Sequence, residues 1–201
     1  MNSNSGKLYL KDFQSLNTIF FSVDLNNGFC KEGALSSDRV RNLIPKTEKF
    51  LKTVLKSGFK VIAFTDSHGE NSPEFDGYPI HCLADSPESV LVDELSFLYD
   101  HENAKVIPKN STNGFFLLGD DILRGNFDNF IITGCCTDIC IYQLAVTLKT
   151  FFNQLDQKKR VIVPKSLVDT FDSPEHNADE IGKIFLGSMA SNGVEVVDEL
   201  I

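Results

Sequence analysis

Three residues with reactive side chains each lie at or just beyond the end of an apolar run. Asp24 closes the run Thr-Ile-Phe-Phe-Ser-Val-Asp, Lys109 follows Ala-Lys-Val-Ile-Pro, and Cys140 comes just after Phe-Ile-Ile-Thr-Gly-Cys-Cys-Thr-Asp-Ile. Such runs are typical of buried strands in a parallel sheet, whose carboxyl ends meet at one crevice. A carboxylate, an amine and a thiol in one crevice predict a thiol-based acyl-transfer site.

In such a site Asp24 would take the proton of the Cys140 thiol. Lys109 would hold the charge and the orientation of these groups through hydrogen bonds. Each residue alone also fits an ordinary role. A strand-end aspartate is often a turn or cap residue, and a single lysine is usually a solvated surface charge. Their shared position at strand ends is what favours chemistry.

The segment from Gly134 to Cys140 favours a nucleophile. Gly134 ends the expected strand, and Thr137 or Asp138 can cap the following helix. Cys140 would then lie in the first turn, where the helix dipole and free N–H groups stabilise a thiolate and can hold an oxyanion. Buried cysteines are also common as small core residues. Residue types alone leave both interpretations of Cys140 open.

A second group of ligand-type residues lies in the segment 66–89, which is rich in Gly, Pro, Ser and charge. Asp66 and His68 project to the same side of an extended chain, and Glu74 and His81 follow. Two imidazoles with one or two carboxylates suit Zn²⁺, Fe²⁺ or Mn²⁺ and leave positions for water or substrate. A loop this long is uncommon unless it has a function. The spacing fits an incidental polar loop equally well.

Two aromatic residues lie near these groups in the sequence. Phe29 is five residues beyond Asp24, and Tyr78 lies within the loop 66–89. Aromatic rings beside a reactive site can sandwich a flat substrate, although core or loop anchoring is the stronger interpretation from residue type alone. The remaining histidines, His101 and His176, have no ligand-like neighbours in sequence, and we expect both on the surface.

Alternating apolar and helical patterns predict an α/β fold with a parallel sheet covered on both faces. At 201 residues the chain suits a single domain, 1–201, with a functional loop at 66–89. The expected strands are 18–24, 60–65, 105–107, 127–133, 159–163 and 194–197, and the expected helices are 39–56, 139–152 and 178–190.

Charge and cysteine content restrict the function classes. A net charge of −9 argues against nucleic acid or an anionic membrane surface as a partner. The polar start of the chain has no signal-peptide pattern, and no apolar run is long enough to span a membrane. Five cysteines without an export signal indicate reduced thiols and a cytoplasmic location, with Cys30 and the side chain of Cys135 as core residues.

Four segments together resemble the isochorismatase-like cysteine hydrolase superfamily. They are Val23-Asp-Leu-Asn-Asn-Gly-Phe29, Lys109-Asn-Ser-Thr-Asn-Gly-Phe115, Gly134-Cys-Cys-Thr-Asp-Ile-Cys140 and Val168-Asp-Thr-Phe-Asp-Ser-Pro-Glu-His-Asn-Ala-Asp179. The resemblance implies a three-layer α/β/α sandwich around a six-stranded parallel sheet. It also implies an Asp24, Lys109 and Cys140 triad, and a cis peptide between Cys135 and Cys136 that turns the N–H groups of Cys136 and Cys140 into an oxyanion hole.

Within the superfamily, the loop 66–89 is similar to that of the nicotinamidases. Asp66, His68 and His81 match their metal-binding pattern, and Glu74 matches a subgroup with a glutamate as fourth ligand. The resemblance implies one divalent metal ion, zinc in the first place with iron or manganese as alternatives. Phe29 and Tyr78 fall where nicotinamidases place ring-stacking aromatics.

Two departures from the family pattern bear on the substrate. Leu25-Asn26 replaces the commoner Met-Gln, and Thr112 lies where an aromatic is often found. The implied reaction is hydrolysis of nicotinamide to nicotinate and ammonia in NAD salvage. A related hydrolase acting on another small amide is one alternative. A non-catalytic metal- or ligand-binding protein with a redox-sensitive Cys140 is another, and a homo-oligomer stays open.

Overall fold

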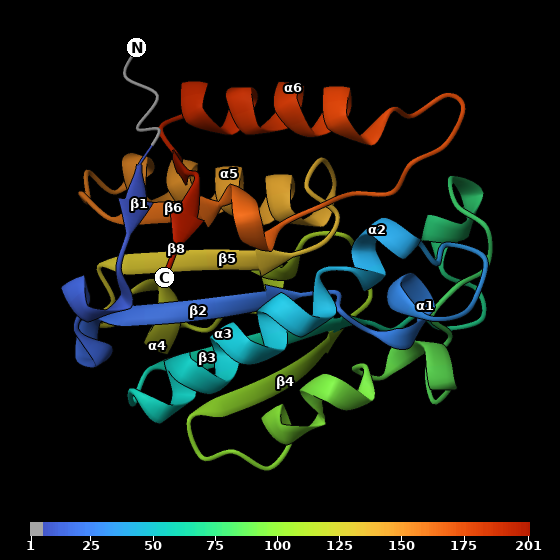
Figure 1. The fold of residues 1–201 in the computed structure, drawn as a ribbon, viewed down its shortest axis with the longest axis horizontal. Coiled ribbons are helices and arrows are strands. Elements are labelled where there is room, and N and C mark those ends of the chain that lie inside the picture. Colours follow the sequence, from blue (N-terminus) through green and yellow to red (C-terminus); the bar gives the residue numbers. More distant parts are fainter. Residues whose placement is uncertain (1–5) are drawn as a thin grey trace.

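The computed structural model describes residues 6–201, which fold around a six-stranded parallel sheet (Figure 1). The strand order is β4-β3-β2-β5-β6-β7. The strands are β2 (Thr18–Val23), β3 (Lys60–Asp66), β4 (Ala104–Lys109), β5 (Asn129–Gly134), β6 (Arg160–Pro164) and β7 (Glu195–Val197). All residues of β2 and β5 are buried, which explains why both read as continuous apolar runs. The predicted six-stranded parallel sheet is confirmed.

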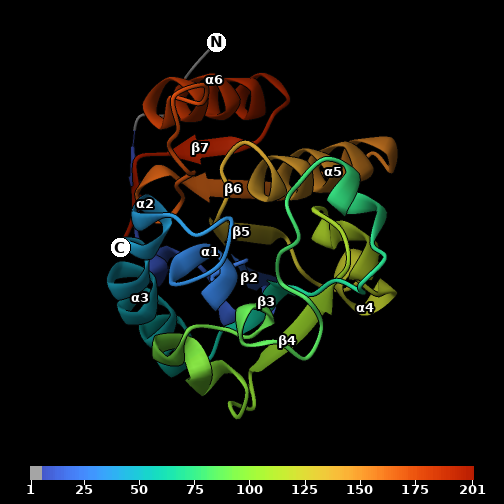
Figure 2. The ribbon, with the colours of Figure 1, turned by 90° about the vertical axis from the view of Figure 1, so that its right-hand side faces the viewer.

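Helices cover both faces of this sheet. Figure 2 shows α3 (Ile44–Lys56) on one side and α5 (Cys140–Gln154) on the other, with α6 (Ala178–Ser191) beyond β7. The shorter helices are α1 (Asn27–Cys30), α2 (Asp38–Arg41) and α4 (Asp120–Leu123). A small parallel pair, β1 (Lys7–Leu8) with β8 (Glu199–Leu200), was not predicted. Its strands are too short to leave a sequence pattern.

The single helix predicted at 39–56 is wrong, since the structure divides it into α2 and α3. Pro45 lies in the first turn of α3. Proline has no N–H, and inside a continuous helix its ring would collide with the carbonyl four residues earlier, whereas the first turn accommodates it. The chain therefore ends α2 and starts a new helix, which puts Arg39 and the residues before it above the carboxyl end of the sheet.

Beyond Asp66, the last residue of β3, the segment 66–89 contains only short 3₁₀ turns, at Pro73–Asp76 and Pro87–Ser89. One isolated bridge, His68 with Leu83, closes the segment on itself, and another just beyond it, Asn26 with Leu91, joins the chain to the segment after β2. The segment thus lies over the carboxyl ends of the strands, on the side that faces the viewer in Figure 2. The prediction of a long loop without regular structure here is confirmed.

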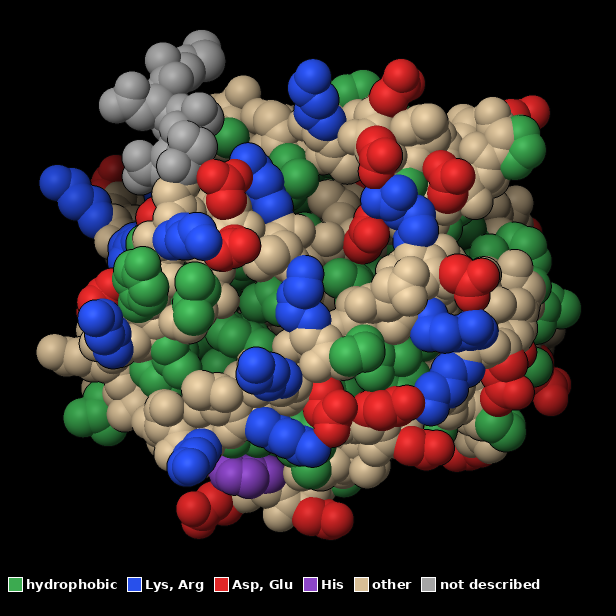
Figure 3. All heavy atoms as spheres, in the orientation of Figure 1, with side chains coloured by type: hydrophobic (Ala, Val, Ile, Leu, Met, Phe, Trp, Pro, Cys, Tyr) green, Lys and Arg blue, Asp and Glu red, His purple; other side chains and the backbone are tan. Residues whose placement is uncertain are grey.

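Acidic and basic side chains are interspersed over the face that Figure 3 shows. Within residues 6–201, none of the helices has both the length and the apolar character that a membrane crossing requires.

Candidate active site

Three strand ends bring two carboxylates and one amine together. Asp66 and Lys109, the last residues of β3 and β4, are paired in the parallel register, and Asp24 directly follows β2. The Lys109 Nζ atom lies 2.6 Å from Asp66 Oδ1 and 2.9 Å from Asp24 Oδ2. All three side chains are almost completely buried. Lys109 is therefore no surface lysine; it neutralises charge inside the protein.

Asp24 has an unusual backbone conformation, with a φ of 56° that places it in the left-handed region. Its N–H donates to the carbonyl of Phe64, 3.0 Å away on β3. Its Oδ1 atom is buried and has no hydrogen-bond partner among residues 6–201. Left-handed residues other than glycine cost free energy and concentrate at functional sites. The backbone conformation at Asp24 thus costs stability, and it holds the carboxylate beside Lys109.

The two carboxylates have opposite pKa shifts. Burial raises the pKa of Asp24 to about 7, and the charge of Lys109 only partly opposes this rise. Burial would also raise the pKa of Asp66, but Lys109 and the hydrogen bonds from His68 and His81 outweigh it and hold that pKa well below its usual range. The pKa of Lys109 is well above its usual value, because Asp24, Cys140 and Asp66 outweigh burial. Asp24 is thus the carboxylate that can exchange a proton near neutral pH.

Cys140 is the first residue of α5, and its Sγ atom lies 4.0 Å from Lys109 Nζ. The chain enters α5 through Gly134, whose φ is 115° and whose Cα lies so close to β2 that a Cβ would come within 2.1 Å of the Val23 carbonyl. The peptide between Cys135 and Cys136 is cis, as the resemblance implied. Any side chain at position 134 would collide with β2, so glycine is required at this end of β5.

The backbone N–H groups of Cys136 and Cys140 have no hydrogen-bond acceptor in the part of the chain that the structure describes. Both belong to the short turn beside the thiol. Unpaired N–H groups at the start of a helix are suited to stabilise a negative charge. The turn thus offers donors for an oxyanion next to the sulfur of Cys140.

The expectation for the cap of α5 is wrong. Neither Thr137 nor Asp138 caps α5, because the cap position is Ile139 and no side chain bonds there. The Asp138 carboxylate instead accepts from Thr170 and contacts His176. Burial also raises the pKa of the Cys140 thiol well above its usual value, against the opposing charge of Lys109. Burial thus favours the protonated thiol, and a base beside it would favour the thiolate.

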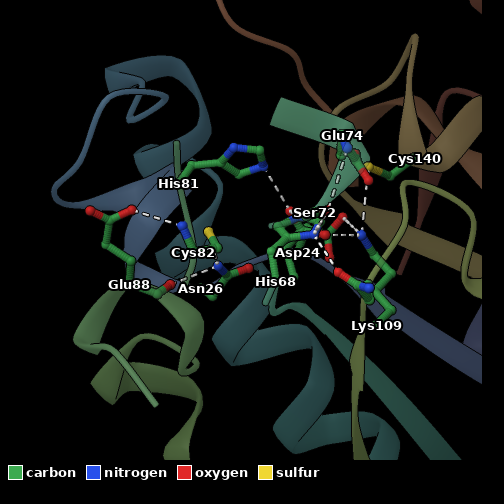
Figure 4. A network of polar contacts seen from close by, with 12 residues as sticks. Asp24, Asn26, His68, Ser72, Glu74, His81, Cys82, Glu88, Lys109 and Cys140 are labelled. Atoms are coloured by element: carbon green, nitrogen blue, oxygen red, sulfur yellow. Dashed lines mark hydrogen bonds and ion pairs between the residues drawn. The ribbon is translucent and has the colours of Figure 1, made fainter. Parts of the chain in front are cut away.

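The second group of predicted residues converges on the other oxygen of Asp66. His68 Nε2 lies 2.7 Å and His81 Nε2 3.1 Å from Asp66 Oδ2. The ligand atoms of these three buried residues lie within 4.8 Å of one another. Figure 4 shows His81 on one side of the network and Lys109 with Cys140 on the other. Asp66 belongs to both groups, since its two oxygens face different partners.

The surroundings of the two histidines fit a bound cation. His68 Nδ1 lies 2.9 Å from Asn110 Oδ1, and His81 Nδ1 lies 2.7 Å from the Pro79 carbonyl. Both partners are acceptors, so each Nδ1 carries a proton. Each Nε2 then points towards Asp66, and either a proton or a metal ion can lie between the two atoms. Burial lowers the pKa of both histidines, but Asp66 outweighs it and raises both. Fixed Nδ1–H tautomers are typical of metal-binding histidines.

A cavity of about 540 Å³ joins the two groups. Its wall includes Asp24, Asp66, His81 and Cys140. It also includes the predicted residues Phe29, Glu74 and Tyr78. Glu74 lies outside the set of three ligand atoms, so among the described residues the compact ligand group is Asp66, His68 and His81. The rings of Phe29 and Tyr78 lie 5.7 and 6.1 Å from that of His81.

Sequence reasoning missed several residues of this site. Asn110 orients His68, and its position directly after Lys109 was a signal that went unused. Phe171 lines the cavity from the segment between β6 and α6. His176, expected on the surface, is only 17% exposed and contacts Asp138. Contacts between distant segments such as 138 and 176 leave no pattern in a single sequence.

The five cysteines are free thiols, as expected. Burial raises the pKa of Cys30 to about 12, which fits a core residue. Cys135 is also buried, and its thiol donates to the backbone carbonyl of Asp24, 3.1 Å away. Neither is a second nucleophile.

Comparison with known proteins agrees with this geometry. A model of the isochorismatase domain matches residues 18–197. The chain belongs to the isochorismatase family. Nicotinamidase 1 of Arabidopsis thaliana is 28% identical over 176 residues, which cover 79% of this chain and 72% of that relative.

Solved structures of the family superimpose over most of the chain. A pyrazinamidase of Pyrococcus horikoshii in complex with zinc has a TM-score of 0.69 and 26% identity, covering 90% of this chain and 98% of that one. A pyrazinamidase/nicotinamidase of Streptococcus mutans has a TM-score of 0.75 at 18% identity, covering 90% and 99%, and shows the fold. The isochorismatase-family fold is thus established independently of the site residues.

Proposed function

We propose that this isochorismatase-family protein is a metal-dependent nicotinamidase, which hydrolyses nicotinamide to nicotinate and ammonia through a thioester on Cys140. The observation that carries the proposal is the double use of Asp66. One of its oxygens holds Lys109, which contacts Asp24, and the other faces His68 and His81. A ligand group and a base–thiol pair that share one residue are suited to act on the same small molecule.

The reaction begins with proton transfer within the triad. Asp24, with a pKa of about 7, takes the thiol proton of Cys140, and the Lys109 ammonium, 4.0 Å from the sulfur, stabilises the thiolate that forms. The sulfur adds to the carboxamide carbon. The N–H groups of Cys136 and Cys140 donate to the resulting oxyanion.

Asp24 then returns its proton to the departing amine, so that the C–N bond breaks and ammonia leaves. A water molecule enters, and Asp24 again acts as the base while the water attacks the thioester carbon. The C–S bond breaks and the acid product is released as Cys140 regains its proton. A single carboxylate can serve both half-reactions because its pKa is close to neutral.

Asp66, His68 and His81 hold the metal ion in this proposal, with Glu74 of the cavity wall as a fourth ligand. Zinc is the first expectation, and iron and manganese also suit these donors. When bound, the ion supplies a Lewis-acid site for the ring nitrogen of the substrate. Phe29 and Tyr78 flank the ring, and fixing the carboxamide against Cys140 lowers the barrier by orientation.

The test is ammonia release from nicotinamide by the purified protein, by the chelated protein and after addition of single metals. We expect activity to be lost on chelation and restored by one metal. Cys140→Ala should abolish turnover, whereas Cys30→Ala, a buried cysteine in the opposite core, should retain it. Turnover that survives in Cys140→Ala would disprove the thioester mechanism.

A second candidate is hydrolysis of a different small amide. The cavity of about 540 Å³ has Thr112 in its wall, with its hydroxyl donating to Gln143 2.9 Å away. A small polar residue there leaves more room than an aromatic ring would. A panel of pyridine, pyrazine and aliphatic amides separates the candidates, because a ring nitrogen is needed only in the nicotinamidase.

A further inference from the structure

A second polar cluster lies behind the turn that carries the thiol. Asp138, two residues before Cys140, has a side chain that is only 8% exposed. Its Oδ1 accepts from the Thr170 hydroxyl at 2.5 Å, and its Oδ2 lies 2.8 Å from His176 Nε2. Both partners come from the segment that joins β6 to α6. The start of α5 is thus held from outside the helix.

The same histidine also supports an aromatic wall of the active-site cavity. The rings of His176 and Phe171 are stacked, with centroids 3.9 Å apart and an interplanar angle of 11°. His176 Nδ1 lies 3.0 Å from the Phe171 carbonyl, and Phe171 lines the cavity together with Cys140. The ring of Phe171 is therefore supported on its outer side by the imidazole.

A tight turn brings the two rings together. Ser173 and His176 exchange two backbone hydrogen bonds, of 3.0 and 3.1 Å, and so fold His176 back towards Phe171. The Asp172 carboxylate accepts from the Ala178 N–H at the start of α6. Phe171 is itself only half-buried and is absent from both hydrophobic core clusters. Its position therefore depends on the turn and on His176, because the core does not hold it.

We propose that His176 is a positioning residue of the hydrolase site. Through Asp138 it fixes the turn that presents Cys140, and through its stacking on Phe171 it holds one aromatic wall against a ring-shaped substrate. The first contact governs the reactive geometry of the thiol and the second governs ring binding. The inference rests on the proposed function only for the identity of the substrate.

Two variants separate the two contacts. His176→Gln keeps a donor for Asp138 and loses the stacked ring, so KM for nicotinamide should rise roughly three- to tenfold, the equivalent of one aromatic pair, with kcat changed less. His176→Phe keeps the stack and leaves Asp138 without this partner, so kcat should fall roughly tenfold with KM changed less. We therefore expect His176→Gln to change mainly KM and His176→Phe to change mainly kcat.

His101→Gln is the matched control. The ring of His101 also contacts the backbone, since its Nδ1 accepts from the Asn103 N–H at 3.1 Å, but His101 lies before β4 and outside the cavity wall. Its kinetic constants should stay within about twofold of the parent. If both His176 variants merely lose folded protein, with KM and kcat per folded molecule unchanged, His176 has only a structural role and the proposal is overturned.

A chemical probe tests the positioning role without reference to nicotinamide. Cys140 is alkylated with iodoacetamide and with N-phenyliodoacetamide, and its peptide is quantified by mass spectrometry. The preference for the ring-bearing reagent should fall in His176→Gln and persist in His101→Gln. An unchanged preference would overturn the proposal. Absence of nicotinamide turnover in the parent protein would contradict only the proposed function.

Discussion

The two carboxylates that share Lys109 show how equal burial can produce opposite chemistry. Asp24 and Asp66 are both almost fully buried, and each has one oxygen within 3 Å of the same ammonium group. Asp66 receives two further contacts, from His68 and His81, whereas the second oxygen of Asp24 has no hydrogen-bond partner among residues 6–201. The number of donors is therefore what distinguishes the two sites.

This difference supports the roles proposed for the two carboxylates. A buried carboxylate with a single donor favours its neutral form more than one that several donors surround, which stays charged. Asp24 accordingly has a pKa near 7 and can move a proton, while Asp66 is held anionic and can only attract cations. Lys109 contacts both carboxylates. A change in the charge of one carboxylate should therefore affect the other through the charge of the Lys109 ammonium group.

The largest expected effect comes from neutralising each carboxylate in turn. Asp24→Asn removes the base, so turnover should fall by about two to four orders of magnitude while metal binding is kept. Asp66→Asn removes a ligand and the charge that holds both histidines, so metal binding itself should be lost. Ammonia release and metal content of the purified variants measure the two effects.

Asp128→Asn serves as the control, since that carboxylate is exposed and pairs with Lys159. It should leave both turnover and metal content unchanged. If Asp24→Asn loses its metal as fully as Asp66→Asn does, the division of roles between the two carboxylates is wrong.

The next effect is a pH dependence that belongs to Asp24. The pKa of this group is raised from 3.8 to about 7, so the carboxyl is protonated, and cannot act as a base, below that pH. The value of kcat/KM should therefore fall about tenfold per pH unit below pH 7. A profile measured on the metal-loaded protein checks it. An acidic limb near pH 4 would contradict the assignment.

The free energy of unfolding should also depend on the ionisation of Asp24. It should fall with rising pH, whereas kcat/KM rises. Because the folded pKa of Asp24 exceeds the unfolded one, its contribution is fully present below about pH 4 and is lost as pH rises through 7. The unfolding free energy of the parent should therefore fall relative to that of Asp24→Asn as pH rises over this window. Urea denaturation at several pH values measures it.

The strand ends, and the meeting of Asp24 with Lys109, were predictable from sequence, but the pairing of Lys109 with Asp66 was not. Buried parallel strands read as continuous apolar runs, which placed Asp24 and Lys109 at one edge of the sheet. The contact of Lys109 with Asp66 follows from the register of β3 with β4, which sequence does not reveal. Residue type suggested a solvated lysine, yet long-range pairing buries it between two acids.

The errors have equally specific causes. The break between α2 and α3 was readable from Pro45, but the amphipathic pattern on both sides concealed it. His176 and Asp138 are 38 residues apart and meet only because β5 and β6 are neighbours. Side-chain capping of α5 was inferred from residue type, and the same carboxylate proved more strongly engaged by the neighbouring segment.

The smallest effect concerns the contacts that join the segment after Asp24 to the segment after His81. Cys82 follows His81 and has a φ of 45°, and its N–H donates to Glu88 Oε2, 3.0 Å away (Figure 4). Asn26, two residues after Asp24, donates to Cys82 Sγ at 3.1 Å and to the Glu88 carbonyl at 2.8 Å. These contacts join the segment after β2 to the loop 66–89, which carries His81.

Glu88→Ala should therefore weaken metal binding by up to about tenfold, the lower end of the range for groups that orient metal ligands, because it acts on His81 only through the backbone. Glu88→Gln retains an acceptor and should recover most of the affinity, while Glu48→Ala, on α3 where the carboxylate pairs with Lys52, should have no effect. Titration of the metal-free protein with zinc measures all three. Equal affinities in Glu88→Ala and Glu48→Ala would show that His81 is positioned by Asp66 and Pro79 alone, and that the two carboxylate sites communicate only through Lys109.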